Sequence, residues 1–158
     1  MMKRLKKVAE ERKLFNYITE AVIGEKTDPI AIQAAIADYY GIQFNETTKT
    51  ARADRIRKWF KENSNEGKTK FLIVLDDVWE KVDLNDIGLP NQGVDFKVLL
   101  TSRDIEVCTK MGVEANSLFN VGLLTKEEAQ SLFWKFAKTF DPELHKLGED
   151  IITKCCSL

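Results

Sequence analysis

The sequence of 158 residues is poor in cysteine, histidine and proline, and it carries no excess of charge of either sign. Its three cysteines, Cys108, Cys155 and Cys156, and its single histidine, His145, do not have the paired spacing of a zinc site. Because 24 Lys and Arg residues balance 25 Asp and Glu residues, there is no basic field to attract nucleic acid. No apolar run approaches the roughly 20 residues that a membrane-spanning helix needs. We therefore expect a globular protein of the cytosol or nucleus, with no direct nucleic-acid partner and no transmembrane segment.

Glycine is also scarce, and its 8 copies form no cluster of the kind that wraps a phosphate group. Gly67, Lys68 and Thr69 resemble the end of a phosphate-binding loop. However, Glu62 stands where that pattern requires its first glycine. Thr69 also leads into an apolar strand pattern, whereas a phosphate loop must lead into a helix. We conclude that these three residues are not a phosphate site.

The spacing of the apolar residues predicts helices and strands in alternation up to about residue 121. Helical patterns cover 2–13, 28–41, 48–62 and 104–111, and strand patterns cover 15–23, 71–75, 98–100 and 118–121. Such alternation is typical of an α/β fold, with an open parallel sheet and helices on both faces. Beyond residue 121 the pattern is helical only, with a capping box at Thr125 to Glu128 and a second helix start at Asp141 and Pro142. We therefore expect two subdomains, at residues 1–122 and 123–158.

Two consecutive acids, Asp76 and Asp77, follow the buried strand pattern FLIVL at 71–75. Ligands of open α/β sheets bind at the carboxyl ends of the strands, and a strand that ends in two carboxylates there is a Walker B arrangement. The first carboxylate can hold Mg²⁺, and the second can orient a water molecule for attack on a terminal phosphate. The alternative is that a strand ending in an exposed turn carries Asp only for local hydrogen bonds.

A second strand pattern ends in Thr101, Ser102 and Arg103, which places two hydroxyls and a guanidinium at the same edge of the sheet. Arginine suits phosphate sensing because its charged fork matches phosphate oxygens. The alternative is a surface arginine at the start of a helix. The two strand ends together favour a nucleotide site that has a metal end and a sensor end but no phosphate cradle.

These motifs resemble the NB-ARC module of plant intracellular immune receptors that also carry leucine-rich repeats. The resemblance rests on FLIVLDDVW at 71–79, KVLLTSR at 97–103 and VGLLTKEEAQSLFWKFA at 121–137. Trp79 at the end of the first motif is similar to the coiled-coil class of these receptors. The resemblance implies a P-loop NTPase-like sheet of order 5-1-4-3-2, followed by the first helices of a helical ARC1 subdomain.

The resemblance also implies a function as part of an ADP/ATP switch with Mg²⁺ and slow ATPase activity, in a cytoplasmic receptor of the defence response. Asp76 would bind the metal, Asp77 would be the catalytic acid, and Arg103 would sense the γ-phosphate, with Thr101 and Ser102 beside the nucleotide. The partners would be the nucleotide and the receptor's coiled-coil and leucine-rich-repeat domains, with a possible oligomer on activation.

The same resemblance implies that the chain begins just after the family's phosphate loop and stops at the start of its Gly-Leu-Pro-Leu segment. The first strand of the sheet would then be missing, so we expect weak nucleotide binding and marginal stability for the 158 residues alone. The alternative function is a truncated interaction or decoy module, or a pseudogene product, that binds no nucleotide.

Overall fold

The computed structural model describes residues 2–90, 92–137 and 142–155 of the chain. The chain divides into two compact units, Met1–Leu118 and Phe119–Leu158. None of the described helices is both long and apolar enough to cross a membrane.

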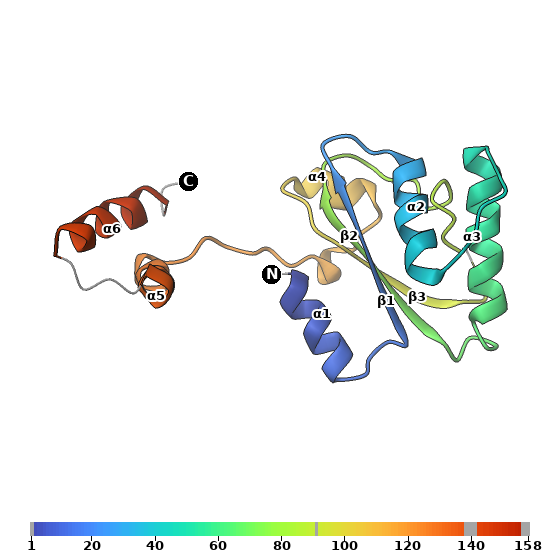
Figure 1. Cartoon of the computed structure of the whole chain (residues 1–158), viewed down its shortest axis with the longest axis horizontal. Coiled ribbons are helices and arrows are strands. Elements are labelled where there is room, and N and C mark those ends of the chain that lie inside the picture. Colours follow the sequence, from blue (N-terminus) through green and yellow to red (C-terminus); the bar gives the residue numbers. More distant parts are fainter. Residues whose placement is uncertain (1, 91, 138–141, 156–158) are drawn as a thin grey trace. The chain divides into compact units, whose positions relative to one another are not determined.

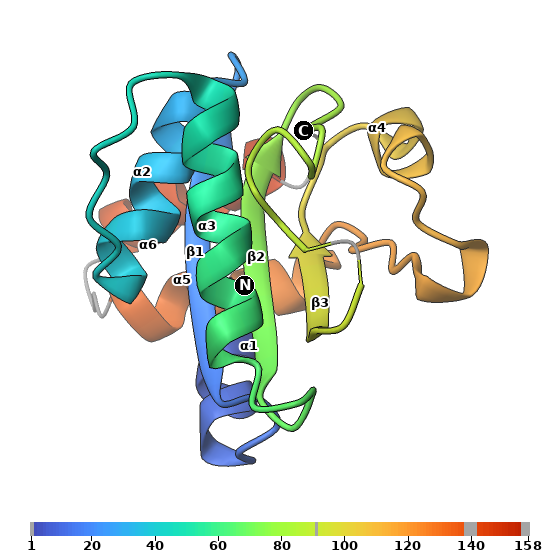
Figure 2. The same cartoon turned by 90° about the vertical axis from the view of Figure 1, so that its right-hand side faces the viewer.

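The first unit is an α/β layer structure (Figures 1 and 2). Within the described residues, one parallel sheet has the order β1-β2-β3, with β1 at Tyr17–Gly24, β2 at Lys70–Val78 and β3 at Asp95–Leu100. Helices α2 and α3, at Pro29–Tyr40 and Lys49–Asn63, cover one face of this sheet, and α1, at Met2–Glu11, covers the other. The predicted α/β fold, with a P-loop NTPase-like sheet and helices on both faces, is confirmed.

Side chains of β2 alternate between the two faces, so this strand contributes to two apolar cores. Phe71, Ile73 and Leu75 belong to the larger core, beneath α2 and α3. Leu72 and Val74 belong to the smaller core, beneath α1. A strand that is buried on both faces needs a continuous apolar run such as the one at 71–75. The polar residues Asp76 and Asp77 therefore lie at the carboxyl end of β2, where this run stops.

Helix α2 is capped at both ends, and α3 is capped at its start. The Asp28 side chain accepts a hydrogen bond from the Ile30 N–H at 2.9 Å, with Pro29 as the first residue of α2. Gly41 ends α2 with φ +67°, a conformation that glycine adopts without a steric penalty. The Thr48 hydroxyl caps α3 by accepting from the Ala51 N–H at 3.3 Å.

The strand predicted at 118–121 is wrong: Leu118 follows a short 3₁₀ turn at Ala115–Ser117, and residues 119–125 form no helix or strand. A strand needs a hydrogen-bonded neighbour, and in the expected order 5-1-4-3-2 that neighbour is the first strand, which is not among the three strands of the described sheet. The three strands match the 4-3-2 part of the expected order. Val98, Leu99 and Leu100 of β3 stay partly exposed, in contrast to the buried residues of β2.

The loop that follows β2, at residues 79–90, is fastened to α2 and α3. The buried Gln33 side chain donates from Nε2 to the carbonyl oxygens of Lys49 and Asp86, at 2.8 and 2.7 Å. Lys49 Nζ also lies 2.6 Å from Asp86 Oδ2. Gly88 packs so closely on α3 that a Cβ there would lie 2.6 Å from the Ala53 carbonyl oxygen. The loop that follows Asp76 and Asp77 is therefore held against α2 and α3 by hydrogen bonds, an ion pair and close packing.

The second unit contains α5 at Lys126–Ala137 and α6 at Pro142–Cys155. The predicted capping box is confirmed, because the Thr125 N–H donates to Glu128 Oε2 at 2.9 Å and the Glu128 N–H donates to Thr125 Oγ1 at 3.2 Å. Of the second predicted helix start, Pro142 begins α6, whereas Asp141 lies outside the described residues.

The two helices of the second unit are joined by polar side chains. Glu149 accepts from Gln130 Nε2 at 2.7 Å and from Trp134 Nε1 at 3.1 Å, and these hydrogen bonds lower the pKa of its carboxyl. His145 stacks on Trp134, with 4.2 Å between the ring centroids. Gly148 lies against the same indole, where a Cβ would approach within 2.4 Å of a ring carbon. The helices α5 and α6 can therefore pack in this way only because residue 148 has no side chain.

We predict that Gly88→Ala destabilises the chain much more than Gly93→Ala. Both glycines have positive φ, +83° and +75°, so both variants carry a backbone penalty of about 1 kcal/mol. Only Gly88 adds a clash with α3, because nothing surrounds the Cβ position at Gly93. We expect a further loss of about 1 to 3 kcal/mol for Gly88→Ala in urea unfolding. Equal midpoints for the two variants would show that the loop does not pack against α3 in this way.

Candidate functional site

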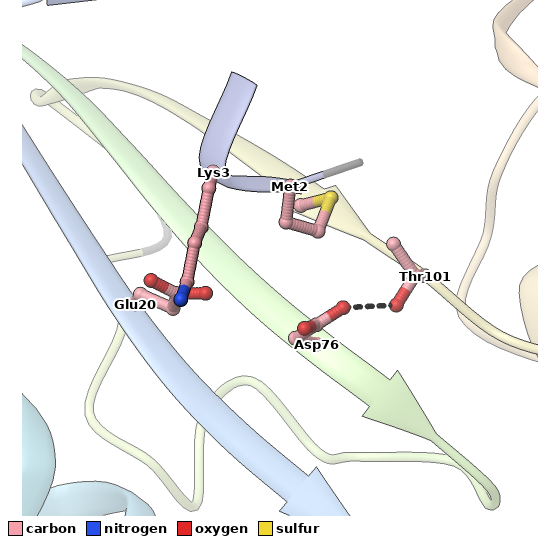
Figure 3. Close-up of a pocket in the computed structure, with 5 residues that line it drawn as sticks. All are labelled: Met2, Lys3, Glu20, Asp76 and Thr101. Carbon is pink, nitrogen blue, oxygen red and sulfur yellow. Dashed lines mark hydrogen bonds between the residues drawn. The ribbon is translucent and has the colours of Figure 1, made fainter. Parts of the chain in front are cut away.

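The two acids predicted from the sequence lie at the carboxyl end of β2, beside the end of β3. Thr101, the residue after β3, donates from Oγ1 to Asp76 Oδ1 at 2.5 Å. The same oxygen accepts from the Asp77 N–H at 2.9 Å. The Val78 N–H also donates to the Thr101 carbonyl oxygen at 2.8 Å. Thr101 thus connects the ends of the two strands, and Figure 3 shows its bond to Asp76.

Asp77 has a left-handed backbone conformation, with φ +57°. A residue with a Cβ adopts this conformation at a cost of roughly 1–2 kcal/mol, so its neighbours must hold it there. The hydrogen bonds that Asp77 and Val78 donate to Thr101 provide this support. As a result, the two carboxylates have different surroundings: Asp76 lines a hollow, whereas Asp77 contacts Arg103.

The hollow in front of Asp76 has a volume of about 380 Å³ and is open to solvent. Its other lining residues are Met2 and Lys3 at the start of α1, Glu20 of β1, and Thr101 (Figure 3). The first N–H groups of a helix have no partner within the helix, and they favour an anion. Glu20 is paired with Lys6, whose Nζ lies 2.6 Å from Glu20 Oε2. The hollow is therefore lined by two carboxylates, Asp76 and the Lys6-paired Glu20, and by the start of a helix.

Arg103 lies outside this hollow, beside Asp77. Its Nε is 3.7 Å from Asp77 Oδ1, and its guanidinium carbon is 5.2 Å from the centre of the Trp79 ring. Ser102 takes part in the turn before α4, which spans Ile105–Lys110, because its hydroxyl accepts from the Asp104 N–H at 3.1 Å. The structure thus brings Asp76, Asp77 and Thr101 into one hydrogen-bonded group, with Arg103 at its edge and Ser102 in the neighbouring turn.

Met2, Lys3 and Glu20 are not among the site residues predicted from the sequence. A signal for Glu20 exists, because it is the one charged residue in the strand YITEAVIG of β1. Met2 and Lys3 are brought to the hollow by the packing of α1 on the sheet, which the sequence pattern does not define.

The donor atoms of the site fit a metal ion that arrives with a phosphate ligand. Mg²⁺ is usually bound by one or two carboxylates together with water and phosphate oxygens. Asp76 supplies such a carboxylate, with Oδ1 oriented by Thr101. Among the described residues there is no group of three His, Cys, Asp or Glu that could hold a metal ion.

Comparison with known proteins identifies the family of the chain. The profile of the NB-ARC domain matches residues 1–142, which is most of the chain. The chain belongs to the NB-ARC family. This assignment confirms the resemblance that the motifs around Asp76 and Arg103 indicate, and it agrees with the α/β fold of the first unit.

Several curated relatives of this NB-ARC chain are proteins of Arabidopsis thaliana. It is 32% identical over 149 residues to disease resistance protein At4g27190, an alignment that covers 91% of this chain and 14% of the relative. It is 30% identical over 161 residues to disease resistance protein SUMM2, covering 96% of this chain and 17% of the relative. It is 30% identical over 140 residues to probable disease resistance protein At5g47250, covering 88% of this chain and 16% of the relative. The chain therefore spans about a sixth of the length of these relatives.

We predict that Thr101→Val destabilises this NB-ARC chain and that Thr101→Ser does so much less. Valine has the shape of threonine but neither donates to Asp76 nor accepts from the Asp77 N–H, so it leaves two partly buried polar groups without this partner. We expect a loss of about 1 to 2 kcal/mol for Thr101→Val in urea unfolding. If Thr101→Val were as stable as the unmutated chain, the hydroxyl would not hold the strand ends together.

Proposed function

We propose that the chain is part of the ADP/ATP-binding switch of a plant immune receptor that acts in defence against pathogens. Membership of the NB-ARC family and the disease resistance proteins among its relatives support this proposal. The structural observation that carries it is the group of Asp76, Thr101 and Asp77 at the carboxyl edge of a parallel sheet, where Asp76 and Thr101 share a hollow with the start of α1. This edge is where α/β proteins bind nucleotides.

Each residue of the site has a proposed role. A bound Mg²⁺ would neutralise charge on the phosphate oxygens. Asp76 would hold that ion, and the Thr101 hydroxyl would keep the Asp76 carboxylate turned toward it. Asp77 would orient the water that attacks the terminal phosphate, which would make the intact receptor a slow ATPase. Arg103 would contact the γ-phosphate, with Ser102 in the turn beside it.

The 158 residues include no glycine-rich phosphate loop, so within them the start of α1 is the main source of free N–H groups for phosphate. We therefore expect weak nucleotide binding by these residues alone. The intact receptor would be cytoplasmic, would include coiled-coil and leucine-rich-repeat domains, and would form an oligomer on activation. No observation favours the alternative of a decoy module that binds no nucleotide.

The proposal is tested by measuring ADP and ATP binding calorimetrically with Mg²⁺, for the chain alone and for the chain preceded by a strand and a phosphate loop of the family pattern. In the loop-bearing protein, Arg103→Ala should weaken ATP binding roughly 10- to 150-fold with little change for ADP, because it loses a charge-assisted contact to the γ-phosphate. Asp76→Ala should also weaken Mg-ATP more than ADP. Asp77→Ala should leave binding intact and slow hydrolysis about 10²-fold.

The unextended chain serves as the control for the phosphate loop, and we expect little binding by it. If the loop-bearing protein bound neither nucleotide, the switch would be contradicted and the decoy module supported. If it bound both but Arg103→Ala and Asp76→Ala changed neither affinity, the roles of these two residues would be wrong.

A further inference from the structure

Trp79 and Arg103 form a contact that the nucleotide site, as described so far, does not explain. Trp79 directly follows β2, and 42% of its surface is exposed. Arg103 lies beyond the end of β3, and its side chain is 77% exposed. The guanidinium carbon of Arg103 lies over the Trp79 ring, 5.2 Å from its centre. The contact between the exposed Trp79 ring and the exposed Arg103 guanidinium thus connects the ends of β2 and β3.

The other contact of Arg103 is too weak to hold this side chain in one place. Its Nε is 3.7 Å from Asp77 Oδ1, which is longer than a hydrogen bond, and the pair is open to solvent. Such pairs contribute little, because fixing a long side chain costs entropy. An indole face attracts a guanidinium over a broad flat surface, and it does so best among the aromatic side chains. The ring therefore contributes at least as much to the position of Arg103 as the Asp77 carboxylate does.

The course of the chain gives the ring its own support. Asp77 turns the backbone with φ +57°, and Trp79 follows two residues later. The next residue, Glu80, accepts from the Thr27 N–H at 3.2 Å, and Val78 is buried in the main core. Both neighbours of Trp79 are thus anchored. The backbone on both sides of Trp79 is held, and this limits the positions that its indole can take.

We propose that Trp79 is a positioning residue that holds the Arg103 guanidinium beside Asp77 before any ligand binds. The inference rests on the proposed function only for its ligand, the terminal phosphate that Arg103 would sense. Because Trp79 orders the side chain in advance, the phosphate binds an arginine that is already in place. The size of a cation–π contact at an exposed site corresponds to a roughly two- to fivefold effect on that binding.

The test measures the order of the Arg103 Nε–H group by NMR relaxation in the 158-residue chain without ligand. Arg103→Lys assigns the signal by removing it. We expect an ordered Nε–H in the unmutated chain, partial order in Trp79→Phe, and a fall in Trp79→Leu to an order parameter below about 0.6, typical of a flexible group. A disordered Nε–H in the unmutated chain, or equal order in Trp79→Leu, would overturn the proposal.

The chain contains a matched internal control. The Arg52 guanidinium carbon also lies 5.2 Å from the centre of an aromatic ring, that of Phe44, and its Nε donates to the Glu46 carbonyl oxygen at 3.0 Å. The Arg52 signal should not change in any Trp79 variant, and a change there would mean that the variant disturbs the fold. For that case, a second measurement leaves Trp79 in place. In the 5-fluorotryptophan-labelled chain, Arg103→Lys should shift the Trp79 fluorine resonance, and no shift would overturn the proposal.

A nucleotide measurement separates this inference from the proposed function. In the loop-bearing protein, Trp79→Leu should weaken Mg-ATP about two- to fivefold and leave ADP unchanged. In an Arg103→Ala background the same change should have no further effect, whereas a merely structural role would weaken both proteins alike. If the unmutated loop-bearing protein bound no nucleotide while Arg103 lost its order in Trp79→Leu, the proposed function would fail and the positioning role would stand.

Discussion

The hydroxyl of Thr101 is the point at which the two strand ends of the site are held together. It donates to the Asp76 carboxylate and accepts from the Asp77 N–H, so a single oxygen fixes a side chain and a backbone group of β2 from the end of β3. The bond to the Asp77 N–H also helps to offset the cost of the left-handed conformation of Asp77. The different surroundings of the two carboxylates, one at a hollow and one beside Arg103, follow from this arrangement.

The sheet and its helices place Thr101 where it can make these bonds. In the parallel pair, Leu75 lies opposite Leu100, so the next residues on the two strands meet just beyond the apolar core. Burial of Leu72 and Val74 beneath α1 and of Ile73 beneath α2 and α3 holds β2 in this register, since a slip by one residue would turn its side chains to the other face. The same packing brings the start of α1 to the hollow in front of Asp76.

Much of this arrangement could be predicted from the sequence, because polar residues directly after buried strands must meet at one edge of a parallel sheet. Asp76, Asp77 and Thr101 were found in this way, and the caps at Asp28 and Thr125 mark helix starts by local chemistry. The strand at 118–121 was predicted wrongly because strand patterns do not reveal whether a partner is present. Contacts between distant segments, such as Lys3 at the hollow and the stacking of Arg103 on Trp79, depend on packing and side-chain rotamers that no local pattern encodes.

A paramagnetic ion tests most directly whether the end of β2 is a metal–nucleotide site organised by Thr101. Mn²⁺ replaces Mg²⁺ and broadens nearby amide NMR signals steeply with distance, so it detects even weak binding to the isotope-labelled chain. With ADP and Mn²⁺ present, we expect broadening centred on 75–78, 101–103 and the start of α1, and its loss in Asp76→Asn. Broadening centred elsewhere, or unchanged in Asp76→Asn, would show that the end of β2 does not hold the metal–nucleotide ligand.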